Sequence, residues 1–186
     1  MKKIILFGDS IFNGFRDGQD TDLVTNLFQK ELKDYAQVEN ISKSGATTVE
    51  ALDYLHLIPQ KRDLVVVEYG NNDAATGWGI RPESYERNLN EVLTQVGKAI
   101  VVGLCYPDPT NSEINQFYGD ERVDLFNGIA KKVAEKHSAQ FVDILPAFRK
   151  LKAISTYYQK DGQHLTDKGN EFLVNQIMPA IKKELD

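Results

Sequence analysis

Near its start the chain reads Lys3-Ile4-Ile5-Leu6-Phe7-Gly8-Asp9-Ser10, a stretch typical of the first strand of a parallel α/β sheet. Its four consecutive apolar residues have the length and branching of a strand that is buried on both faces, and Gly8 ends the run. Strands of this kind occupy the middle of parallel sheets in α/β proteins. Ser10 then lies just beyond the carboxyl end of a central strand, which is the edge where open α/β sheets bind ligands.

Segments typical of strands and helices alternate along the rest of the chain. Right-handed crossovers between parallel strands place helices on both faces of a sheet. We therefore predict a flavodoxin-like three-layer α/β/α sandwich with a five-stranded parallel sheet. The predicted strands are residues 3–7, 37–41, 64–69, 99–104 and 140–144, and apolar residues at helical spacing predict helices within 23–32, 82–96, 123–133 and 166–181.

Length and composition exclude several classes of protein. At 186 residues the chain is long enough for a sizeable core, and we expect one domain over residues 1–186. The formal net charge is −5 and no stripe of Lys and Arg is present, so nucleic acid is not an expected partner. Cys105 is the only cysteine, which excludes an internal disulfide and a cysteine-rich metal site.

The N-terminal residues imitate only the beginning of a signal peptide. Met1-Lys2-Lys3 is basic, but the apolar segment that follows, residues 4–7, is too short for a signal core. No later segment is long and apolar enough to span a bilayer. We expect a cytoplasmic protein without a stable membrane anchor, and the sequence leaves its oligomeric state open.

A serine at a strand end has two interpretations. It more commonly caps a helix or forms a turn, and it becomes a nucleophile where a base lies nearby. Of the three histidines, His56 falls near the end of a further helix that we predict to include Tyr54-Leu55-His56-Leu57, and His137 falls in the last turn of the helix that contains 123–133. We interpret both as structural or solvated. His164 lies in the polar loop after the last predicted strand, at the same edge as Ser10.

Asp161 stands three residues before His164, in a turn that contains Gly162. A carboxylate at that spacing can accept a hydrogen bond from Nδ1 of the ring and leave Nε2 free to act as a base. Taken alone, an Asp-x-x-His sequence is more often a surface turn. The pair becomes informative only together with a nucleophile.

Two other strand ends offer donors for an oxyanion. Gly45 follows the second predicted strand, and its backbone amide can approach a substrate closely because it has no side chain. Asn72 follows the third strand with a side-chain amide, and Asp73 beside it can cap the next segment. Taken separately, each of these segments is more often a turn.

Four short blocks, in this order, resemble those of the SGNH hydrolases, also called GDSL-type lipases, acylhydrolases or esterases. Each block is weak alone, but together they span nearly the whole chain. The resemblance implies an ester hydrolase with the SGNH hydrolase fold. The blocks are Gly8-Asp9-Ser10 with Gly14 shortly after it, Asn40-x-Ser42-x-x-Gly45-x-Thr47, Gly70-x-Asn72-Asp73 and Asp161-x-x-His164.

Carried onto these positions, the resemblance implies a Ser-His-Asp catalytic triad. Ser10 would be the acylated nucleophile, His164 its base and Asp161 the residue that orients the base. The oxyanion hole would consist of the backbone amides of Ser10 and Gly45 and the side chain of Asn72. Asp9 and Asp73 are expected to support these turns rather than to take part in the chemistry.

The expected substrate is a small-molecule acyl ester or thioester with a small or short acyl chain, and no cofactor is expected. No metal is required, because one His-Asp pair has too few ligands for zinc and the sequence lacks His-Glu-x-x-His and Cys-x-x-Cys. Trp78 and Tyr106, in the loops after the third and fourth strands, are candidates for the wall of an acyl pocket. The alternative for each ring is packing onto the core.

A different class of function is a non-catalytic flavodoxin-like module that binds a nucleotide or a flavin. A phosphate-binding loop needs several small residues at the first strand end, whereas here Asp9 and Ser10 are followed by Ile11-Phe12. A receiver-like domain that holds a metal with Asp9 and Asp73 would leave the Asp-x-x-His block unexplained. An SGNH fold that only binds its ligand is a further alternative.

Overall fold

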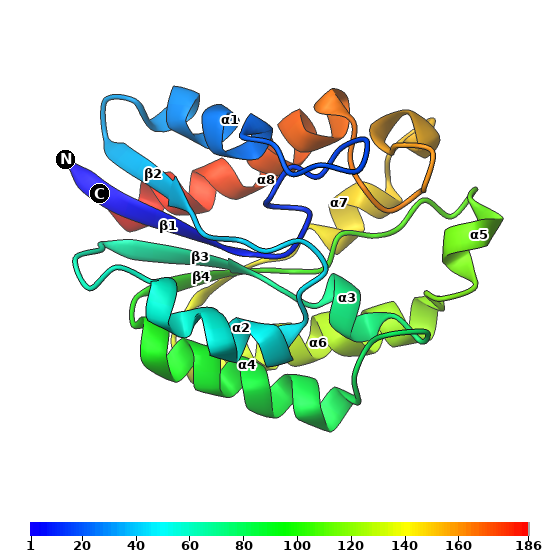
Figure 1. Ribbon diagram of the computed structural model, residues 1–186, viewed down its shortest axis with the longest axis horizontal. Coiled ribbons are helices and arrows are strands. Elements are labelled where there is room, and N and C mark those ends of the chain that lie inside the picture. The colour runs from blue at the N-terminus through cyan, green and yellow to red at the C-terminus, as the bar shows by residue number, and fades with distance from the viewer. Residues whose placement is uncertain (186) are drawn as a thin grey trace.

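A computed structural model describes residues 1–185 and contains a five-stranded parallel sheet (Figure 1). The strand order is β2-β1-β3-β4-β5, which confirms the predicted flavodoxin-like α/β architecture. The strands are β1 (Lys2–Gly8), β2 (Ala36–Asn40), β3 (Leu64–Glu68), β4 (Ala99–Val102) and β5 (Gln140–Val142).

β1 is the strand predicted from the N-terminal stretch, and it lies between β2 and β3. Its residues 4–7 have no solvent exposure, because the sheet is covered on both faces. Leu6 pairs with Asn40 on one side and with Val66 on the other. β2 lies on one side of β1, and β3, β4 and β5 follow on the other side, so the direction of strand addition reverses at β1. Parallel α/β sheets bind ligands in the crevice at such a reversal.

Long helices form the two outer layers (Figure 1). α1 (Leu23–Leu32) and α8 (Asp167–Leu185) cover one face, and α2 (Thr48–Tyr54), α4 (Pro82–Val96) and α6 (Asp120–Lys136) cover the other. The alternation of side chains along β1 divides the core accordingly: Ile4 and Leu6 pack under the first pair of helices, and Ile5 and Phe7 pack under the other three.

Short helical segments occur in the loops, where periodicity did not predict them. A four-residue helix spans about one turn, so it has too few positions to show an apolar period. These segments are α3 (Asn71–Ala74), α5 (Ser112–Asn115), α7 (Leu145–Arg149) and the 3-10 turns η1 (Leu55–Leu57) and η2 (Ile154–Tyr157). α3 and α5 follow β3 and β4, so they lie at the carboxyl edge of the sheet.

The single cysteine is part of the core. Cys105 is buried, and burial raises the pKa of its thiol.

Among the described residues, no helix has both the length and the apolar character needed to cross a bilayer.

Candidate active site

The four sequence blocks come together at the carboxyl edge of the sheet. Ser10 follows β1, Gly45 follows β2 and Asn72 lies in α3, directly after β3. His164 comes from the loop that precedes α8. They enclose a cavity of about 320 Å³, which is lined by Ser10, Phe15, Ser44, Gly45, Asn72, Gln163 and His164.

Ser10, His164 and Asp161 form a hydrogen-bonded chain. The Ser10 Oγ lies 2.9 Å from Nε2 of His164, and Nδ1 of the same ring lies 2.7 Å from Oδ2 of Asp161. A neutral ring that donates from Nδ1 to the carboxylate has an unprotonated Nε2, which can accept the serine proton. The arrangement therefore places a base and an orienting acid beside a serine from the opposite end of the chain.

The Asp161 carboxylate is held by three hydrogen bonds. Besides the His164 ring, the backbone amides of Gln163 and His164 donate to its Oδ1, each at 2.9 Å. Partial burial acts to raise the pKa of Asp161, but these hydrogen bonds outweigh it and lower the pKa. The carboxylate is therefore ionised at neutral pH, which is the state that keeps the imidazole in one tautomer.

Neighbouring segments hold the His164 loop from two sides. On one side the backbone amide of Asp108 donates to the Gly162 carbonyl oxygen at 2.8 Å. Gly162 has φ of +72°, and an added Cβ would lie 2.7 Å from the Cβ of Asn111, so both conformation and close packing require glycine. On the other side the Phe15 ring centroid lies 4.6 Å from that of His164.

The backbone amides of Ser10 and Gly45 are available as oxyanion donors. Within residues 1–185, neither amide donates a hydrogen bond to another protein group. Gly45 has φ of +78°, and no atom lies within 4 Å of a Cβ added there. Glycine is favoured at this position by its left-handed backbone conformation, not by a lack of space.

The Asn72 side chain is fixed at both ends of its amide. Nδ2 donates to Oδ2 of Asp9 and to the carbonyl oxygen of Ala46, each at 3.1 Å. Oδ1 accepts a hydrogen bond from the indole nitrogen of Trp78 at 3.2 Å. Because both hydrogens of Nδ2 have acceptors, donation to a substrate oxyanion requires one of them to be shared.

Asp9 and Glu68 are buried next to each other at the end of β1 and β3. Asp9 Oδ1 accepts from the Ile11 amide at 2.9 Å, which stabilises the turn that presents Ser10. Glu68, the last residue of β3, is 1% exposed, and its Oε2 accepts a long hydrogen bond of 3.4 Å from the Asp9 amide. Burial raises the pKa of both carboxyls, and the nearby Asp9 raises that of Glu68 further.

Sequence reasoning missed Glu68. The sequence feature that could have indicated it is an acidic residue directly after the apolar run 64–67, at the end of a predicted strand.

Asp73 links the third block to α2. Its Oδ1 accepts from the backbone amide and the hydroxyl of Thr48 at 2.9 and 2.5 Å, and its Oδ2 has no hydrogen-bond partner. Burial raises the pKa of Asp73 to about 7, even though the Thr48 hydrogen bonds act to lower it. Thr48 is the first residue of α2, so Asp73 supports that helix, and it is not among the residues that line the cavity.

The two candidates for the acyl-pocket wall are placed differently. Neither Trp78 nor Tyr106 lines the cavity at Ser10. Trp78 borders the site through its hydrogen bond to Asn72. The Tyr106 hydroxyl donates to Oδ1 of Asp120 at 2.7 Å, so this side chain is tied to the start of α6.

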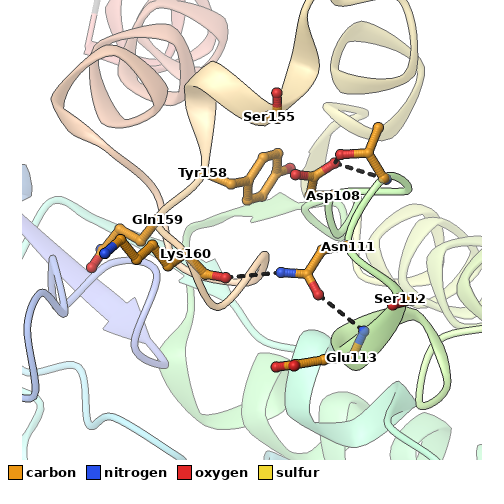
Figure 2. Close-up of a pocket in the computed structure, with 9 residues that line it drawn as sticks. Asp108, Asn111, Ser112, Glu113, Ser155, Tyr158, Gln159 and Lys160 are labelled. Atoms are coloured by element: carbon orange, nitrogen blue, oxygen red, sulfur yellow. Dashed lines mark hydrogen bonds between the residues drawn. The ribbon is translucent and has the colours of Figure 1, made fainter.

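A larger cleft, of about 490 Å³, adjoins the segment just before Asp161. Figure 2 shows how its walls are joined: the Asn111 side chain donates to the Lys160 carbonyl oxygen at 2.9 Å and accepts from the Glu113 amide at 3.0 Å. The cleft contains no residue of the four blocks, so we place the chemistry at the smaller cavity. It is lined by Asp108, Thr110, Asn111, Ser112, Glu113, Ser155, Tyr158, Gln159 and Lys160.

The other two histidines do not line the cavity. Nδ1 of His56, in η1, contacts the Asp53 carbonyl oxygen at 2.7 Å, and Nε2 of His137, at the end of α6, lies 3.2 Å from Oδ1 of Asn90. Across residues 1–185, no group of three or more His, Cys, Asp or Glu side chains is arranged to hold a metal ion.

The sequence matches one protein-family model, and the fold matches several solved structures. The model of the GDSL-like lipase/acylhydrolase family matches residues 6–172. A lipase/acylhydrolase from Enterococcus faecalis is 28% identical, with a TM-score of 0.91 over 100% of this chain and 98% of that chain. TesA is 26% identical, with a TM-score of 0.78 over 98% of this chain and 99% of that chain.

The acetyl xylan esterase AlAXEase shares the fold, with a TM-score of 0.75 at 21% identity over 96% of this chain and 99% of that chain. No curated protein matches the sequence.

Proposed function

Because the chain belongs to the GDSL-like lipase/acylhydrolase family, we propose that it hydrolyses small or short-chain acyl esters or thioesters through a Ser-His-Asp acyl-enzyme mechanism. One observation carries the mechanism: Ser10 Oγ lies 2.9 Å from His164 Nε2, whose ring is held through Nδ1 by Asp161. The Enterococcus faecalis relative, at 28% identity, is itself a lipase/acylhydrolase.

The reaction proceeds in two steps. In the first, Nε2 of His164 takes the proton of Ser10 as Oγ attacks the carbonyl carbon, and the resulting tetrahedral intermediate carries a negative oxygen. The protonated Nε2 then gives its proton to the leaving alcohol or thiol, and an acyl-serine remains. In the second, His164 removes a proton from a water molecule as its oxygen attacks the carbonyl carbon of the acyl-serine. The bond from that carbon to Ser10 Oγ then breaks, His164 returns the proton to Oγ, and the acid is released.

Three donors stabilise the negative oxygen. The backbone amides of Ser10 and Gly45 are two of them, because neither has an acceptor within residues 1–185. Asn72 Nδ2 is the third, and it donates by sharing a hydrogen that is now bound by Asp9 or Ala46. Asp161 stays ionised and stabilises the imidazolium that forms in each step. The chain supplies every group in this scheme, so it needs no cofactor.

The size of the cavity supports a small acyl group. Its volume of about 320 Å³ is near the lower end of ligand pockets, which begins at about 300 Å³. Larger alcohol portions of the ester must extend out of it.

The mechanism is tested by comparing Ser10→Ala with the unmodified protein on p-nitrophenyl esters and acyl thioesters of increasing chain length. The variant should lose about 10⁴-fold or more in kcat, because it lacks the nucleophile, while its thermal unfolding is unchanged. Ser112→Ala is the matched control, since Ser112 lines the other cleft, and it should retain full activity.

Two results would contradict the proposal. Turnover by Ser10→Ala near that of the unmodified protein would exclude the serine mechanism. A complete lack of turnover by the unmodified protein, together with bound flavin or nucleotide, would instead favour the non-catalytic module.

A further inference from the structure

Trp78 defines the orientation of the Asn72 amide. Its indole nitrogen lies 3.2 Å from Oδ1 of Asn72. An indole N–H only donates, so it can bond to the oxygen end of an amide and not to the nitrogen end. At the nitrogen end, Asp9 and Ala46 supply two acceptors. Rotating the amide by half a turn therefore breaks three hydrogen bonds at once.

A tight turn brings Trp78 back to Asn72. The Gly79 amide donates to the Ala75 carbonyl oxygen at 2.9 Å, and the next amide along the chain donates to the Asp73 carbonyl oxygen at 3.0 Å. A Cβ added at Gly79 would lie 2.2 and 2.3 Å from the carbonyl oxygens of Asp73 and Ala75. Only glycine fits this turn, and its geometry determines where the preceding residue, Trp78, is placed.

Side chains from the loop after β4 hold the indole from outside. The ring centroid of Trp78 lies 5.0 Å from that of Phe117 and 6.2 Å from that of Tyr118. Nε of Arg122 donates to the Ala74 carbonyl oxygen at 2.6 Å, which fixes the same turn to α6. The indole remains 45% exposed, so the core does not depend on it.

We propose that Trp78 is a positioning residue for ester hydrolysis, whose indole N–H holds the Asn72 amide in the orientation in which Nδ2, and not Oδ1, can share a hydrogen with the oxyanion. This role rests on the proposed function. An amide that rotates presents Oδ1 to the developing negative charge in part of the molecules, and that orientation repels it. The loss therefore falls on the transition state and not on binding of the neutral ester.

The composition of the chain permits a single-atom test. Trp78 is the only tryptophan, so biosynthetic replacement of tryptophan by 3-benzothienylalanine exchanges one indole N–H for sulfur and keeps a fused aromatic ring of nearly the same shape. We expect kcat for p-nitrophenyl acetate to fall about tenfold, the effect of one mispositioned donor, while KM changes less than about twofold. Protein containing 5-fluorotryptophan keeps the N–H and should match the unmodified protein.

A double-mutant cycle distinguishes positioning from general damage. Trp78→Phe should lower kcat by a similar factor in the unmodified background and have no further effect when Asn72 is already alanine. The protein also has a single indole N–H signal in a ¹H–¹⁵N spectrum. Asn72→Ala should shift that signal and speed its exchange with solvent, whatever the activity.

Different results would contradict the role of Trp78 and the proposed ester hydrolysis. Full kcat in the benzothienylalanine protein, or additive effects in the cycle, overturns the role of Trp78 and leaves the esterase proposal intact. An indole signal that does not respond to Asn72→Ala overturns the contact itself. Absence of ester hydrolysis by the unmodified protein overturns the proposed function, and the role of Trp78 falls with it.

Discussion

Asp73→Asn changes a carboxyl that the fold buries without a counter-charge. Its Oδ1 accepts two hydrogen bonds from Thr48, its Oδ2 has no partner, and its pKa is raised to about 7 by burial. Asparagine has nearly the shape of the neutral acid and keeps an oxygen for Thr48. The substitution therefore removes the ability to ionise while preserving the contacts.

The expected size of the effect follows from linkage between protonation and folding. A carboxyl with a pKa of about 7 when folded and 3.8 when unfolded binds its proton more tightly in the folded state. Its stabilising protonation is complete below about pH 4 and is lost as the pH rises through 7. Relative to a side chain that does not titrate, Asp73 therefore lowers the free energy of unfolding by about 2 kcal/mol at pH 5 and about 4 kcal/mol at pH 8, because the carboxyl ionises at a lower pH in the unfolded state than in the folded state.

The free energy of unfolding of Asp73→Asn, relative to the unmodified protein, should therefore increase by about 2 to 3 kcal/mol between pH 5 and pH 8. Urea titrations at half-unit pH steps measure this difference. Asp34→Asn, at an exposed position, is the control and should give a difference that does not change with pH. A constant difference for Asp73→Asn across this range would contradict the prediction, because Asp73 would then have the same pKa in the folded and unfolded states.

Three further substitutions test other parts of the structure. Asp161→Asn should lower kcat by about 10³-fold or more, because the ring loses its ionised partner; a loss below tenfold on a p-nitrophenyl ester would contradict this. Gly79→Ala should lower the free energy of unfolding by more than about 3 kcal/mol in urea titrations, because its Cβ meets two carbonyl oxygens. Gly128→Ala in α6, with open space around its Cβ, should raise it by about 0.5–1 kcal/mol; similar values for the two would argue against the steric explanation. Tyr106→Phe should leave kcat/KM within about twofold, because its hydroxyl bonds to Asp120 and not to the cavity; a tenfold change would return Tyr106 to the substrate site.

The sheet and its long helices were predictable because their signals are local. A strand buried on both faces leaves a continuous apolar run, and residues 4–7 carry it. α4 is marked at both ends by Pro82 and Gly97. α3 and α5 were missed because each contains only four residues. Their positions depend on hydrogen bonds to the loops around them.

The candidate site divides in the same way. The residue types of the four blocks place Ser10, Gly45, Asn72 and His164 at strand ends or in the last loop, and the structure brings them to one cavity. Glu68 was missed because the sequence shows a charged residue at a strand end, and a charged residue there is more often solvated. Only the tertiary structure shows that this side chain is buried, next to the backbone amide of Asp9 in the turn after β1.

The succession of strands and long helices along the chain, the candidate site's edge of the sheet and its residue types could all be predicted from the sequence. They depend on side-chain periodicity and on turn chemistry within a few neighbouring residues. Which side chains meet became known only from the folded structure: Ser10 with His164, the Asp9 amide with Glu68, and Trp78 with the oxygen of Asn72. Contacts of this kind depend on loop paths, and these are set by hydrogen bonds between segments far apart in the chain.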